Sequence, residues 1–134
     1  MKNLKGKLKK ITAMTLLTAT ILVGGFSSVS AYSSSVNLSY NTHSNGNGSV
    51  NGKSNGVFYN LGNKVTYLRV YSKSGRGKIN VSLIKGWFEY GTVGVNGSGT
   101  FKFREKAVPS GKYHLRAWGG YANSYMRLSG AIIQ

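Results

Sequence analysis

Residues 64–84 read KVTYLRVYSKSGRGKINVSLI, and this stretch decides the fold class. Apolar and polar residues alternate in its two halves, Lys64–Ser72 and Lys78–Ile84, as they do in β-strands that have one buried face. We expect the buried side chains to be Thr66, Leu68 and Val70 in the first half and Ile79, Val81 and Leu83 in the second. The polar, glycine-containing segment Lys73–Gly77 between the two halves predicts a hairpin.

Short alternating segments continue on both sides of this stretch, and turn residues separate them. We predict further strands at residues 36–40, 57–59, 87–90, 92–95, 100–104, 112–118 and 124–133. Asn96-Gly97 predicts a two-residue turn, because both residue types tolerate positive φ. With about eight short strands and no sustained helical period after the N-terminal region, the sequence predicts an all-β fold, a small antiparallel β-sandwich or barrel.

The segment Asn41–Gly56 reads NTHSNGNGSVNGKSNG and has almost no apolar side chains. Such a segment buries too little surface to offset the entropy that it loses on ordering. We therefore expect a mobile low-complexity loop or a weak edge hairpin at residues 41–56, within a single domain.

Residues 110–116 read SGKYHLR, and Gly119-Gly120 and Ser124-Tyr125 follow. This pattern is similar to the closing strands of secreted bacterial β-sandwich modules such as the pre-peptidase C-terminal type. The resemblance implies a sandwich fold, and it implies nothing about function.

The N-terminal region has the three parts of a secretory signal peptide. Residues 1–10 contain five lysines and no acid, residues 11–26 are mostly apolar, and the small residues Val29-Ser30-Ala31 fit a cleavage site. The apolar run is short for a membrane-spanning helix, which needs about 20 residues, and threonines interrupt it. We expect residues 1–31 to be removed and the mature domain, Tyr32–Gln134, to be secreted into the extracellular space.

Charge is the strongest signal in the composition. The chain has 18 Lys plus Arg residues and only 2 acids, Glu89 and Glu105, and it has no cysteine. Because five of the lysines lie in the leader, the side chains of the mature domain carry a net charge of +11. Such a domain repels its own copies and attracts polyanions. The partner we expect is an anionic cell-wall polymer, an acidic polysaccharide or an anionic membrane surface, with nucleic acid as an alternative; no protein partner can be inferred.

Alternation also predicts which side chains face outward, and cations and aromatic rings occupy these positions together. Guanidinium and ammonium groups contact anionic oxygens, and flat rings stack on sugars or bases. The candidate ligand-binding residues are Tyr67, Arg69, Tyr71, Lys102, Arg104, His114, Arg116, Trp118, Tyr125 and Arg127. The sequence leaves open whether they share one face or are scattered over the surface.

Residue types that support catalysis are scarce. Glu89 and Glu105 are isolated acids, and we expect them to pair with neighbouring cations rather than to act as a glycosidase pair. His43 and His114 have no carboxylate or thiol nearby in the sequence and make a poor metal site. The chain has no Asp to orient a histidine and no Gly-x-Ser-x-Gly motif. We predict no enzymatic activity, no catalytic residue, no bound metal and no cofactor.

These observations favour a secreted, cationic, non-enzymatic binding protein for anionic polymers or surfaces of a bacterial envelope. The alternative is a secreted antimicrobial or bacteriocin-like protein that acts on the membrane or wall of a target cell. A third interpretation is an extracellular nucleic-acid binder, because basic grooves with stacking rings also suit single strands.

Overall fold

Two antiparallel β-sheets make up the part of the chain that the computed structural model describes, residues 31–134. The signal peptide predicted for residues 1–31 lies outside the described residues, apart from Ala31. The strands are β1 (Ser33–Asn41), β2 (Ser49–Asn51), β3 (Tyr59–Leu61), β4 (Tyr67–Ser74), β5 (Ile79–Lys85), β6 (Phe88–Val95), β7 (Gly99–Lys102), β8 (Gly111–Trp118) and β9 (Tyr125–Ile133). The described residues form no helix that is long and apolar enough to cross a membrane.

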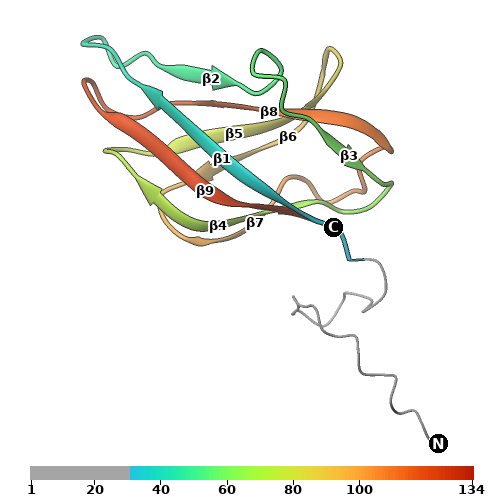
Figure 1. Ribbon diagram of the computed structural model, residues 1–134. Coiled ribbons are helices and arrows are strands. Elements are labelled where there is room, and N and C mark those ends of the chain that lie inside the picture. Colours follow the sequence, from blue (N-terminus) through green and yellow to red (C-terminus); the bar gives the residue numbers. More distant parts are fainter. Residues whose placement is uncertain (1–30) are drawn as a thin grey trace, which may run out of the picture. The chain divides into compact units, whose positions relative to one another are not determined.

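The first sheet, sheet 1, has the strand order β1-β9-β4-β7, and the second, sheet 2, has the order β2-β8-β5-β6. The short strand β3 also pairs with β8, at the opposite end from β2, so that two short strands share one edge of sheet 2. In Figure 1 the sheets form two layers, with β2, β8 and β5 in the upper layer and β9, β4 and β7 in the lower one. The fold is a nine-stranded antiparallel sandwich, which confirms the predicted fold class.

The core lies between the sheets and consists of the alternate residues that the sequence predicts. All six inward-facing residues predicted between positions 66 and 83 are at most 2% exposed. β8 adds Tyr113, Leu115 and Ala117, and β9 adds Met126, Leu128 and Ile132. Removing this apolar surface from water is the main stabilising contribution to such a fold. Because successive side chains on a strand point to opposite faces, the residues between these positions must lie on the outer faces.

The hairpin predicted at Lys73–Gly77 is wrong, and the bend at Asn96–Gly97 is not a hairpin either, because the chain crosses between the sheets at both places. β4 belongs to sheet 1 and β5 to sheet 2, so Lys73–Gly77 connects strands that do not pair. β6 and β7 also lie in different sheets, and neither Asn96 nor Gly97 has the positive φ of a tight hairpin turn. Within the described residues, the one pair of consecutive strands that forms a hairpin is β5–β6, with Gly86 and Trp87 in its turn.

The segment Asn41–Gly56 is tied to the sandwich more closely than its composition suggests. Residues 49–51 form β2, which pairs with β8. Thr42 is buried, and its hydroxyl donates to the Tyr121 carbonyl at 2.5 Å and accepts from the Ser124 N–H at 2.8 Å. The segment thus contributes one short edge strand to sheet 2 and forms no hairpin of its own, because its backbone pairs with β8 and such pairing can order polar residues that bury little apolar surface.

Candidate functional site

The ten candidate residues do not share one surface, because the sandwich divides them between its two outer faces. Tyr67, Arg69, Lys102, Tyr125 and Arg127 extend from sheet 1, and His114, Arg116 and Trp118 extend from sheet 2. Tyr71 is the extra residue of a β-bulge in β4, and Arg104 follows the end of β7. Stacked sheets lie about 10 Å apart, so one ligand group cannot contact Arg127 and Arg116 together.

On sheet 1, Arg127 and Tyr125 form a cation–ring pair. They are two positions apart on β9, so their side chains extend from the same face. The guanidinium carbon of Arg127 lies 6.0 Å from the centroid of the Tyr125 ring, and Tyr125 is 52% exposed. The pair offers an anionic ligand a charged fork and a ring next to each other.

A polar groove of about 220 Å³ borders this pair. Hydroxyl and amide side chains of β1, β4 and β9 line the groove, namely Asn37, Ser39, Ser72, Ser74 and Ser129. The hydroxyl oxygens of Ser72 and Ser129 are hydrogen-bonded at 2.8 Å across the β4–β9 pair. Hydroxyl groups both donate and accept, so the groove suits a hydroxylated or anionic polymer.

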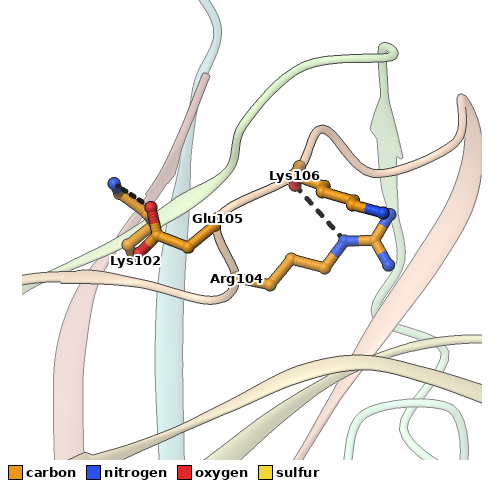
Figure 2. A network of polar contacts seen from close by, with 4 residues as sticks. All are labelled: Lys102, Arg104, Glu105 and Lys106. Atoms are coloured by element: carbon orange, nitrogen blue, oxygen red, sulfur yellow. Dashed lines mark hydrogen bonds and ion pairs between the residues drawn. The ribbon is translucent and has the colours of Figure 1, made fainter.

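Lys102 and Arg104 are already engaged within the protein, as Figure 2 shows. The Lys102 ammonium forms an ion pair with Glu105 at 3.1 Å, the only ion pair found among residues 31–134. The Arg104 guanidinium folds back to donate to the Lys106 carbonyl at 3.3 Å, and it lies 5.0 Å from the centroid of the Tyr90 ring. These contacts give Arg104 a role in holding the loop after β7, so it is a weaker ligand candidate than Arg127.

On sheet 2, two cation–ring pairs lie along β8. The guanidinium carbon of Arg116 lies 5.7 Å from the Trp118 ring centroid, and the Lys112 ammonium lies 4.3 Å from the Phe58 ring centroid. Arg116 and Lys112 are exposed, and Trp118 is half-buried. Alternate residues on a strand are about 6.8 Å apart, so the two cations are separated by about 13 Å along β8.

The prediction that His114 is an exposed binding residue is wrong. His114 lies on the outer side of β8, but it is only 5% exposed, because Phe58 packs against it with ring centroids 6.2 Å apart in an edge-to-face arrangement. Burial lowers the pKa of His114, and the positive charge of Lys53 lowers it further. The neutral ring is therefore favoured, and His114 supports the surface from beneath rather than contacting an anion.

Exposed groups at one end of sheet 2 are absent from the predicted set. Trp87, in the β5–β6 turn, is 94% exposed, and Phe88 beside it is 68% exposed. The Lys53 ammonium lies 5.7 Å from the Trp87 ring centroid. A sequence signal for this group exists: two adjacent large rings after a glycine cannot both face a core, because successive strand side chains point to opposite faces.

The acids and histidines are spread over the described domain. Glu89 accepts a hydrogen bond from the Thr92 hydroxyl at 2.5 Å and forms no ion pair within residues 31–134, contrary to expectation, whereas Glu105 pairs with Lys102 as expected. Within residues 31–134, no group of three or more His, Cys, Asp or Glu side chains is placed to hold a metal ion.

No family model matches the chain, and no curated protein or solved structure matches it. The similarity of residues 110–125 to the closing strands of pre-peptidase modules therefore remains a resemblance of sequence pattern. The fold places the chain in the class of all-β sandwiches, with cation–ring pairs on both outer faces.

Proposed function

We propose that the mature domain, Tyr32–Gln134, is a secreted, non-enzymatic protein that binds anionic polymers or surfaces of a bacterial envelope through the cation–ring pairs on its outer faces. The observation that carries this proposal is that Arg116 and Arg127 each lie beside an aromatic ring at the surface. The one ion pair among residues 31–134 involves neither arginine, so both guanidinium groups are available to an external anion.

The net charge supports the same proposal. With two acids in the whole chain, the side chains of the mature domain carry a net charge of +11, and this charge concentrates polyanions at its surface. Charge alone would bind any polyanion. The ring beside each arginine adds a short-range contact that requires a flat partner such as a sugar, and this contact is not screened by salt.

A linear ligand fits this surface better than a compact one. Lys112 and Arg116 lie on one strand about 13 Å apart, and they can contact successive anionic groups of a chain that runs along β8. On the other side of the sandwich, the polar groove beside Arg127 is open and bordered by hydroxyl groups. Wall polymers that carry phosphate and acidic polysaccharides both have this combination of regular charge and hydroxyl groups.

The test is binding to purified bacterial walls, before and after chemical removal of their phosphate polymers, as the salt concentration rises. The affinity for untreated walls should fall steeply as the salt concentration rises, because the Debye length shrinks from about 10 Å at 0.1 M salt to about 3 Å at 1 M. Arg116→Ala should weaken binding and reduce the salt dependence, and Trp118→Ala should weaken binding even at low salt. Arg127→Ala and Tyr125→Ala test the other face in the same way.

Lys106→Ala is the matched control, because Lys106 is exposed in the loop after β7 and belongs to none of the cation–ring pairs. If Arg116→Ala and Lys106→Ala lose equal affinity for the walls and Trp118→Ala loses none, the domain binds through diffuse positive charge alone, and the proposal is overturned. Tighter binding to single-stranded DNA than to walls at physiological salt would instead identify a nucleic-acid binder. Growth inhibition of test bacteria would identify an antimicrobial protein.

A further inference from the structure

The turn between β5 and β6 is the most exposed apolar point of the described domain. It contains Trp87, which is 94% exposed, and Phe88, which is 68% exposed, and Gly86 before them has a φ of 62°. Phe58, 39% exposed, lies at the same end of sheet 2, because it packs on His114, whose register partner Ile84 is close to the turn. Large rings gathered at an exposed point mark an interaction site more strongly than single scattered apolar residues do.

Three lysines surround these rings. The Lys53 ammonium lies 5.7 Å from the Trp87 ring centroid, and the Lys112 ammonium lies 4.3 Å from the Phe58 ring centroid. Lys85 is the last residue of β5 and lies opposite Phe88 in the β5–β6 pair. The carboxylate closest in sequence, Glu89, accepts a hydrogen bond from the Thr92 hydroxyl. The rings therefore lie within a positively charged rim.

The combination of protruding rings and a lysine rim fits a lipid bilayer better than a dissolved polymer. A ring that is almost wholly exposed on a turn has no neighbouring protein surface that would hold a ligand stacked on it. Trp118, in contrast, lies against the sheet, which provides such a surface. Tryptophan favours the headgroup level of a bilayer, and lysine stems extend along the apolar region while their ammonium groups reach anionic lipids.

We propose that the β5–β6 turn, through Trp87 and Phe88, inserts into the headgroup region of an anionic lipid bilayer, with Lys53, Lys85 and Lys112 contacting lipid phosphates. This inference goes beyond the binding of envelope polymers proposed above, because it depends on the rings of the β5–β6 turn and shares only Lys112 with that proposal. Either one can fail while the other stands.

The two tryptophans of the chain allow a direct test. In the Trp118→Phe variant, Trp87 is the only tryptophan, and its fluorescence should shift to shorter wavelength with vesicles of phosphatidylglycerol and phosphatidylcholine and be quenched by brominated lipid. Vesicles of phosphatidylcholine alone should give a much smaller response, because the lysine rim then lacks an anionic partner. In the matched Trp87→Phe variant, the emission of Trp118 should not be quenched by brominated lipid.

Vesicle co-sedimentation measures how much each side chain contributes to the affinity for anionic vesicles. Trp87→Ala should weaken binding to the anionic vesicles on the order of tenfold through lost apolar contact, and Lys53→Ala about fivefold, as expected for one lysine at an anionic surface. Circular dichroism of each variant checks that the sandwich is intact.

Unquenched Trp87, or equal vesicle binding by Trp87→Ala and the unmodified domain, would overturn the proposal and leave adsorption through the charged faces. A shift of Trp87 emission that depends on protein concentration without vesicles would also overturn it, in favour of a second copy of the chain as the partner. Wall binding by Trp87→Ala separates the two proposals, because it should be retained if polymer binding uses only the faces.

Discussion

The side chain of Gln134 is joined to the backbone of Gly62 by two hydrogen bonds: its Oε1 accepts from the Gly62 N–H at 2.9 Å, and its Nε2 donates to the Gly62 carbonyl at 2.8 Å. The same Nε2 donates to the Thr66 hydroxyl at 3.0 Å. The backbone of Gln134 exchanges hydrogen bonds with Tyr32 at 3.1 and 3.3 Å. One buried residue thus ties the connection between β3 and β4, and the approach to β1, to the end of β9.

Gln134→Glu should lower the free energy of unfolding by about 1–3 kcal/mol. The carboxylate cannot donate to the Gly62 carbonyl, and it places a charge in a site that is 5% exposed. Urea denaturation measures the change. Asn63→Asp, the same chemical change at an exposed position, should shift stability by less than about 0.5 kcal/mol. Equal effects of the two substitutions would contradict the role given to Gln134.

Gly130→Ala should be destabilising by about 1–3 kcal/mol, because it overpacks the sheet. A Cβ at position 130 would lie 1.9 Å from the carbonyl oxygen of Arg69, a backbone atom of the paired strand β4. The β4–β9 pair would have to move apart, which thermal denaturation should reveal as a lower Tm. Gly97→Ala is the control, since nothing lies within 4 Å of its Cβ position and its φ is not positive. A Tm for Gly130→Ala no lower than that of the control would show that the strands adjust freely.

The domain should lose stability as the pH falls from 7 to 5, in part through His114. Burial and Lys53 hold the pKa of His114 below its ordinary value of 6.5. The unfolded chain therefore binds the proton first, so stability is full above about pH 6.5 and is lost as the pH falls through the folded pKa. Urea denaturation at several pH values should show a smaller loss in His114→Gln than in the unmodified domain. His43→Gln, at an exposed position, should lose as much stability with falling pH as the unmodified domain. An equal loss of stability between pH 7 and 5 in His114→Gln would contradict the role given to His114.

Protein recovered from the culture medium of an expressing bacterium should begin at Tyr32. Ala31 ends the small-residue cleavage site, and the backbone of Tyr32 is the first to pair with the end of β9. N-terminal sequencing or intact mass measures this directly. Released protein that still begins at Met1 would show that the leader is not cleaved.

The inner faces of the strands could be predicted from the sequence because the alternation of apolar and polar residues is a local property. The pairing of the strands could not. The turn sequence at residues 73–77 shows that the chain reverses there, but it does not show that β5 joins the other sheet. That choice depends on the strands from the far end of the sequence, because β9 pairs with β4 and β8 pairs with β5.

The candidate site was predictable to the same extent. The outward positions of Arg69, Arg116 and Arg127 follow from the period of two, and each of these side chains is exposed. The burial of His114 does not follow, because Phe58 covers it from a segment distant in sequence. The division of the candidate residues between two faces cannot be predicted from the sequence either, since it depends on which strands share a sheet.

The strand order also determines when folding can occur. β1 pairs only with β9 among the described strands, and β2 and β3 both depend on β8, so the β5–β6 hairpin is the one pairing that joins neighbours in sequence. The long loops between the other partners must close before their contacts form, and β-domains dominated by such distant contacts fold in milliseconds to seconds. A chain leaving a ribosome or a translocation channel therefore cannot complete either sheet until β8 and β9 have emerged, and the edges of β4 and β5 that pair with these two strands stay open until that moment.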